Sequence, residues 1–190
     1  LEVGVFTKKT STIKNVILKK NAAASPLIFV EINHDYEQNS NLCIQDKQTL
    51  VYRESYPYKK LKPEHVEDST YAYKVVPTSV LLFRYSALTF NSHRIHYDTR
   101  YCKKIEGYPG LVVHGPLMAT MLMNLAQAKN SAPLKEFKFR ALAPSFVDEN
   151  LNLILQNDEA RELEVRSDDG SSIMLSIKHI LRCRRSEMMR

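Results

Sequence analysis

The segment at residues 116–128 constrains the fold of this 190-residue chain more than any other. Bulky apolar side chains recur in it at helical spacings, its other residues are small or mildly polar, and it contains no charged residue. A helix without a polar face must be covered on most sides. Pro116 suits the first helical position, where a backbone N–H would have no partner. The sequence therefore predicts a buried central helix.

Strand-like runs follow this helix at residues 136–142, 151–156, 161–166 and 173–181, and the Asp168-Asp169-Gly170 turn precedes the last of them. Turn-forming residues between β-rich runs are typical of antiparallel strands. A buried helix followed by an antiparallel sheet that wraps it predicts an α+β fold.

Three further β-rich runs, at 11–19, 27–36 and 42–53, begin the chain and are separated by turn-like residues at 21–26 and 39–41. The next stretch, 55–69, mixes proline, lysine and acidic residues with little apolar periodicity, which is typical of a linker. We therefore expect partial N-terminal strands at 1–58, a linker at 59–68 and a complete domain at 69–190.

Two shorter helices are expected ahead of the central one. Thr78 or Ser79 can cap a helix that runs through Leu88, because a hydroxyl oxygen accepts from the free amides of a first turn. Asp98 can cap a second helix, and Gly107 suits its left-handed end. A polar segment rich in histidine lies between the two.

Composition limits the functional classes. The chain has a net charge of +6, 44% hydrophobic residues and no apolar run long enough to cross a membrane. Its three cysteines, Cys43, Cys102 and Cys183, are scattered and form no C-x-x-C pair, so we expect neither a disulfide framework nor a metal site, and a reducing, cytoplasmic location. Nucleic acid is not an expected partner, because the basic charge comes with no nucleic-acid-binding motif. The arginines at 182–190 are expected to form a solvated tail.

Most of the chemical information lies in two segments. Residues 89–96 read T-F-N-S-H-R-I-H, and residues 106–116 read E-G-Y-P-G-L-V-V-H-G-P. This pair resembles the MaoC-like hydratase/dehydratase family, whose usual pattern is S-G-D-x-N-P-x-H followed by a His-Gly before the central helix. The departures, above all Asn91 in place of Asp, resemble the branch of type 2 3-hydroxyacyl-thioester dehydratases and mesaconyl-CoA or itaconyl-CoA hydratases. Weaker similarity extends over nearly the whole chain.

The resemblance implies a hot-dog fold, in which an antiparallel sheet wraps a central helix. In the resembling branch two such modules are fused, and residues 1–4 correspond to a position inside the first. We therefore expect a double hot-dog with an incomplete N-terminal module. Strands without their helix would expose an apolar face, which either a preceding segment or a partner subunit would cover. A homo-oligomer, such as a dimer, is expected through the sheets.

The resemblance implies that water is added or removed across the double bond of an enoyl-CoA, 3-hydroxyacyl-CoA or acyl-carrier thioester. His96 is the expected general acid/base, because a neutral imidazole exchanges protons near pH 7. Asn91 cannot titrate, but its amide can orient the reacting water. The Gly115 amide, at the start of the buried helix, can stabilise the enolate oxygen.

Further residues are expected to bind the substrate. His93 and Arg94 can contact a phosphate or the pantetheine arm, although a structural role in the loop is the alternative. His114 either shapes the oxyanion turn or packs beside it. Outside the cleft, the basic residues nearest the catalytic loop are Arg100, Lys103 and Lys104, for which surface salt pairs are the alternative.

No cofactor is expected, because CoA or pantetheine is part of the substrate. The alternative function is a non-catalytic hot-dog protein that binds an acyl thioester or acts as a scaffold. A thioesterase is disfavoured, because residues 116–128 offer no carboxylate. The mitochondrial matrix is the alternative compartment if the source is eukaryotic.

Overall fold

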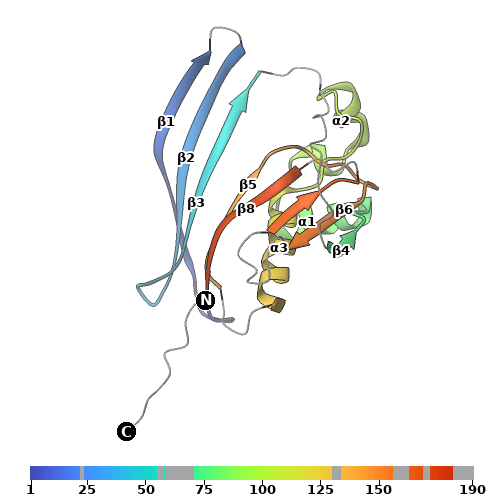
Figure 1. The fold of residues 1–190 in the computed structure, drawn as a ribbon. Coiled ribbons are helices and arrows are strands. Elements are labelled where there is room, and N and C mark those ends of the chain that lie inside the picture. Colours follow the sequence, from blue (N-terminus) through green and yellow to red (C-terminus); the bar gives the residue numbers. More distant parts are fainter. Residues whose placement is uncertain are drawn as a thin grey trace. The chain divides into compact units, whose positions relative to one another are not determined.

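The structure, a computed structural model, describes residues 1–21, 24–54, 58, 71–129, 134–155, 163–168 and 172–181. Contacts divide the chain into two units, Leu1–Tyr56 and Pro57–Arg190, which Figure 1 draws in sequence colours. The expected linker at 59–68 lies outside the described residues, as do Cys183 and the C-terminal arginines. The domain boundaries therefore stay a prediction.

The first unit is a three-stranded antiparallel sheet in the order β1-β2-β3. Its strands are β1 (Lys8–Asn21), β2 (Ala24–Gln38) and β3 (Asn41–Arg53). The three predicted strands are confirmed, but each is longer than expected. The turn predicted at 21–26 is narrower, because Asn21 and Ala24 already pair across the hairpin. Asn39 and Ser40 take left-handed conformations at the other turn, which asparagine tolerates better than most residues.

Side chains alternate across this sheet, so one face collects apolar residues. Val16 pairs with Val30, and Leu18 pairs with Ile28. Alternation along the strands places these side chains on the same face. Val16, Leu18 and Ile28 are exposed.

The second unit contains a five-stranded antiparallel sheet in the order β4-β6-β7-β8-β5. Its strands are β4 (Tyr71–Val75), β5 (Leu134–Ala141), β6 (Leu151–Leu155), β7 (Leu163–Arg166) and β8 (Ser172–Leu181). The four strands predicted after the central helix are confirmed. Strand β4 was not predicted: five residues after a polar stretch are too few for a clear alternating pattern.

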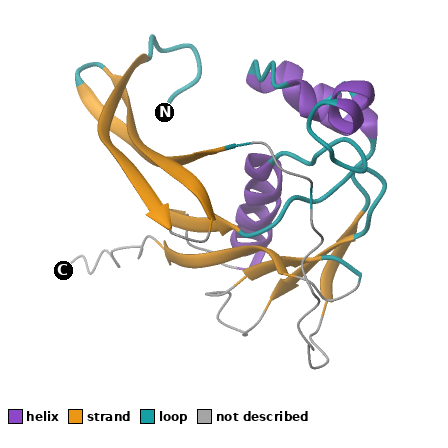
Figure 2. Ribbon diagram, turned by 90° about the horizontal axis from the view of Figure 1, so that it is seen from above, coloured by secondary structure: helices purple, strands orange, loops and turns teal. Residues whose placement is uncertain are grey.

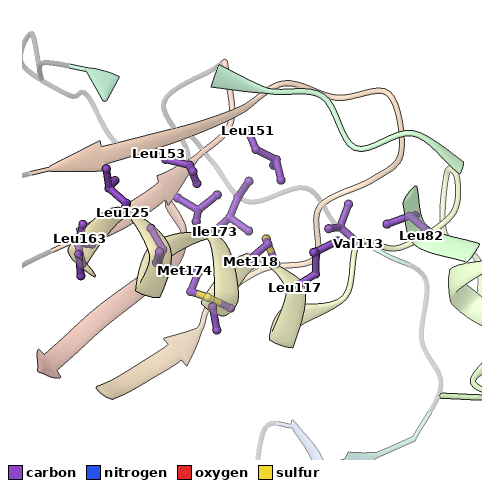
Figure 3. Packing of buried hydrophobic residues seen from close by; sticks show 14 of the residues in the cluster. Leu82, Val113, Leu117, Met118, Leu125, Leu151, Leu153, Leu163, Ile173 and Met174 are labelled. Atoms are coloured by element: carbon purple, nitrogen blue, oxygen red, sulfur yellow. The ribbon is translucent and has the colours of Figure 1, made fainter. Parts of the chain in front are cut away.

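Helix α3 (Gly115–Lys129) is the predicted central helix, and it packs on this sheet (Figure 2). Figure 3 shows Leu117, Met118 and Leu125 of α3 among leucines, isoleucine and methionine from the strands. Leu122 is fully buried. Full burial of one such side chain stabilises the fold by roughly 1.5–3 kcal/mol, so this helix, whose one charged residue is the terminal Lys129, organises the core. The α+β prediction is confirmed.

The shorter helices precede α3. Helix α1 (Ser79–Thr89) is capped by the Thr78 side chain, and α2 (Thr99–Lys104) is capped by Asp98. Between them lies the 3₁₀ turn η1 (Arg94–His96). Helix α2 ends before the predicted Gly107, because the amides of Ile105 and Glu106 both donate to the Tyr101 carbonyl and close the helix there. Gly107 still adopts a left-handed φ of 70°.

Among the described residues, no helix combines the length and the apolar character needed to span a bilayer.

Candidate active site

The loop after α1 holds Asn91 in a fixed orientation. Its backbone N–H donates to the Ser86 carbonyl at 2.9 Å, which ties the loop to the end of α1. Its side-chain Oδ1 accepts from the backbone N–H of His93 at 3.0 Å. Because Oδ1 already has this partner, the Asn91 side chain offers its Nδ2 group, a donor, to any molecule in the site.

His96 ends the η1 turn and is only 7% exposed. Its Nδ1 lies 2.7 Å from the Val112 carbonyl oxygen. A carbonyl only accepts, so Nδ1 carries the proton of the neutral ring and Nε2 carries the lone pair. Burial lowers the pKa of His96 below its ordinary value, more than the Val112 hydrogen bond raises it, and nearby His93 lowers it further. The ring is therefore an unprotonated base near pH 7.

His114 lies directly against His96. The two rings stack with centroids 3.6 Å apart and planes 17° apart. His114 is fully buried, and its Nε2 lies 2.8 Å from the Ser86 hydroxyl. The Tyr85 ring also packs against it in an edge-to-face arrangement, with a centroid distance of 4.9 Å. Burial, helped by the charge that His96 would carry, lowers the pKa of His114 to about 4, so this ring is also neutral near pH 7.

Gly115 follows His114 and begins α3. The His114 carbonyl accepts from the amides of Leu117 and Met118 at 3.1 and 3.2 Å, and Pro116 has no N–H. Among the described residues no acceptor is assigned to the Gly115 amide. A free amide at a helix N-terminus stabilises negative charge, which is the property an oxyanion donor needs.

The structure thus links the three expected catalytic residues through two others. Asn91 is tied to the backbone of Ser86, the Ser86 side chain meets His114, and His114 stacks on His96 and precedes Gly115. Sequence reasoning missed Ser86. Its position one helical turn after the buried Leu82, on the inward face of α1, is the signal that would have identified it.

The expected substrate-binding residues have different environments. Arg94 is paired with Asp98 at 2.7 Å, and its guanidinium lies 4.4 Å from the Tyr101 ring centroid. The Asp98 hydrogen bond raises the pKa of Arg94, and the Tyr101 amide together with Arg94 lowers the pKa of Asp98. Arg94 thus has Asp98 as a partner, and its part in substrate binding stays a prediction. His93 is exposed, and its ring lies edge-on to His96 at 5.7 Å.

Helix α2 carries the remaining basic candidates, Arg100, Lys103 and Lys104. All three are exposed. Within the ranges that the structure describes, none has an assigned ion pair. They are therefore available to an anionic group.

Among the described residues, no three His, Cys, Asp or Glu side chains lie close enough to hold a metal ion. Cys43 and Cys102 are free thiols, and Cys102 is buried with its sulfur 2.9 Å from the Ile95 carbonyl. Among the described residues, two neutral imidazoles, one free backbone amide and one oriented carboxamide lie together, a set of groups suited to acid–base chemistry. The expectation that no cofactor is needed stays a prediction.

Comparison with known proteins supplies the chemical context. Residues 1–147 match the model of the family described as hydroxyacyl-thioester dehydratase type 2. The chain is 41% identical to a mesaconyl-C(4)-CoA hydratase of Chloroflexus aurantiacus over 92% of this chain and 63% of that protein. It is 35% identical to a mitochondrial hydroxyacyl-thioester dehydratase type 2 of Schizosaccharomyces pombe, over 63% of this chain and 41% of that protein. The chain thus spans less than two thirds of either relative.

Solved structures agree on the fold. The crystal structure of HtdX from Mycobacterium tuberculosis superposes with a TM-score of 0.67 at 15% identity, over 90% of this chain and 67% of that one. A MaoC-like dehydratase superposes with a TM-score of 0.64 at 12% identity, over 91% and 69%. At such low identity the likeness concerns architecture, and it confirms the hot-dog fold that the resemblance implied.

Proposed function

The chain belongs to the hydroxyacyl-thioester dehydratase type 2 family, and we propose that it adds water to, or removes water from, the double bond of an acyl thioester. Two relatives, a hydratase of a CoA thioester and a hydroxyacyl-thioester dehydratase, support this reaction type. The proposed substrate is an enoyl- or 3-hydroxyacyl-CoA, or the corresponding acyl-carrier thioester. A mesaconyl-type CoA is favoured by the C. aurantiacus relative.

His96 is the proposed general acid/base. In hydration, Nε2 takes a proton from water as the water oxygen bonds to the β-carbon and the double-bond electrons move to the thioester oxygen. The resulting imidazolium then protonates the α-carbon, and the enolate electrons return. Dehydration is the reverse. The observation that carries this role is the 2.7 Å Nδ1 contact to the Val112 carbonyl, which leaves Nε2 unprotonated.

The Gly115 amide and Asn91 complete the proposed site. The negative charge that develops on the thioester oxygen needs a fixed donor, and the unpartnered amide at the start of α3 meets that need. Asn91, with Oδ1 bonded to the His93 amide, donates through Nδ2 to the oxygen of the reacting water or hydroxyl. As a group that cannot titrate, it leaves all proton transfer to His96.

We propose that the charged end of the substrate binds to basic residues at the surface and that its apolar end binds to buried residues. Arg100, Lys103 and Lys104 would meet the phosphates of CoA or of a carrier at the surface, with His93 nearer the thioester. The acyl chain would extend toward the buried residues Leu111 and Leu117. Because Arg94 is held by Asp98, its phosphate contact would require that pair to open.

Assembly is proposed from the surface of the first unit, and the compartment from the name of a relative. The exposed apolar residues of the first unit's sheet favour association, such as a homodimer, because large apolar patches mark interaction sites. The mitochondrial name of the S. pombe relative is compatible with the matrix, whereas the cytoplasm remains the first expectation.

The test is the absorbance of a conjugated enoyl thioester, crotonyl-CoA, incubated with the purified chain. Hydration removes the conjugated double bond and lowers the absorbance. We expect His96→Ala to reduce the rate roughly 10²- to 10⁴-fold. His34→Ala is the matched control, since His34 is a half-buried imidazole of the first unit, bonded to Ser11 at 2.7 Å. Equal turnover by the His96 variant would refute the base role, and no turnover by any form would favour a thioester-binding protein.

A further inference from the structure

We propose that His114 is a positioning residue for His96: its ring face holds the catalytic imidazole, and Ser86 holds His114. The kinetic consequence of this inference rests on the proposed function, whereas its structural consequence does not. The sequence suggested for His114 only a role in the oxyanion turn or simple packing.

The geometry restrains His96 in two perpendicular ways. The Val112 carbonyl accepts from Nδ1 in the plane of the ring, at 2.7 Å. The His114 ring covers one face of it, at 3.6 Å and 17°. A single in-plane hydrogen bond would still allow the ring to swing about it. The stacked face removes that motion, so Nε2 keeps one direction.

Ser86 and Tyr85, both from α1, in turn hold the His114 ring in place. The Ser86 hydroxyl lies 2.8 Å from Nε2, and the Tyr85 ring packs against the His114 ring in an edge-to-face arrangement with centroids 4.9 Å apart. The buried Nδ1 has no partner among the described residues. A buried N–H without an acceptor costs about 1–3 kcal/mol, which favours the tautomer that donates Nε2–H to Ser86 and leaves Nδ1 as a lone pair.

The stack also affects protonation. The fully buried His114 ring keeps water from one face of His96, and loss of hydration disfavours the charged imidazolium. The groups that face the pair are few in the described part of the chain: His93 from the start of η1, Tyr85 and Ser86 from α1, and the Val112 carbonyl. The nearby charges of Arg94 and Asp98 are paired with each other. The ring face of His114 therefore shields one face of His96 from water.

If Ser86 and His114 only filled space in the core, an apolar pair of side chains would serve as well. Ser86 and His114 lie beside the apolar core, in which Leu82, Val113 and Leu117 are buried. Burying two polar side chains costs free energy that an apolar pair would avoid. The hydrogen bond to Ser86 fixes the angle of the His114 ring, so the ring presents a flat face to His96. An aliphatic side chain has no such face.

The experiment combines NMR titration of the imidazole resonances with kinetics of crotonyl-CoA hydration. His114→Ala removes the ring face, His114→Phe keeps a flat face without a titrating group, and Ser86→Ala removes only the hydrogen bond. Leu82→Ala is the control for core damage, because Leu82 is fully buried one turn before Ser86 on the same helix.

In the unaltered protein His96 should titrate below 6.5. In His114→Ala we expect its midpoint to rise toward 6.5, the acid limb of kcat/KM to move with it, and kcat to fall roughly 10- to 100-fold with KM nearly unchanged. In His114→Phe, the His96 midpoint and kcat should lie close to those of the unaltered protein. In Ser86→Ala, the midpoint and kcat should change in the same direction as in His114→Ala but by less. Ser86→Ala tests the proposal if His114→Ala does not fold.

The proposal is overturned if His114→Ala, or Ser86→Ala in its place, alters thermal stability as Leu82→Ala does while the His96 midpoint stays where it was. It is also overturned if His114→Phe behaves like His114→Ala. Absence of hydratase activity in every form would instead count against the proposed function, because the NMR titration does not depend on turnover.

Discussion

Acid should destabilise this protein through His114, and the sign follows from its burial. The folded-state pKa of His114 is about 4, whereas its ordinary value is 6.5. Between these values the unfolded chain binds the proton more readily than the folded one. The neutral His114 therefore makes its full contribution to the free energy of unfolding above pH 6.5, and this contribution is lost as the pH falls toward 4.

The magnitude can be worked from the two pKa values. Integrating proton uptake from about pH 7 to about pH 4.5 gives a loss of about 2 kcal/mol in the free energy of unfolding from His114 alone. With a urea m-value of about 2 kcal/mol/M, this loss corresponds to a midpoint shift of about 1 M. His96, whose pKa is also lowered by burial, acts in the same direction.

The assay is urea unfolding at both pH values, for the unaltered chain and for His114→Phe. The phenylalanine variant retains a buried ring but cannot take up a proton. The quantity of interest is the change in free energy between the two pH values, so the variant's own stability cancels. We expect the pH-dependent loss to be about 2 kcal/mol smaller in His114→Phe. An identical loss in both proteins would show that His114 is not a buried neutral base.

Other predictions concern the site, the surface and the core. Asn91→Ala should lower kcat by removing the Nδ2 donor, whereas Asn91→Asp should retain more activity with an altered pH profile; equal rates for the two would contradict the donor role. Neutralising Arg100, Lys103 and Lys104 together should raise KM for a CoA thioester while kcat stays close to its original value, and KM should become less sensitive to salt; an unchanged KM at low salt would place the phosphates elsewhere. Leu122→Ala should lower the free energy of unfolding by roughly 2–5 kcal/mol in chemical denaturation, and a loss below about 1 kcal/mol would mean that the core refills the space.

Much of the fold was predictable because its signals are local. The helix around Leu122, which has no charge over residues 116–128, and the alternating strands on either side of it reflect periodicities of 3.6 and 2 residues. A short window of sequence contains both periodicities. The Thr78 and Asp98 caps were predictable for the same reason. Strand β4 was not, since an edge strand of five residues gains its order from pairing with β6.

For the site, the sequence by itself determined which residue types are available. It contains one motif with His96, one non-titrating Asn91 and one glycine before a segment, 116–128, that has no charged residue, and these were enough for a family resemblance. The tertiary structure alone decided how they are arranged. Ser86 and His114 are 28 residues apart, and His114 and His96 stack from different elements. No local pattern encodes such contacts, because ring orientation and burial depend on packing between distant segments, and burial in turn sets the pKa of each imidazole.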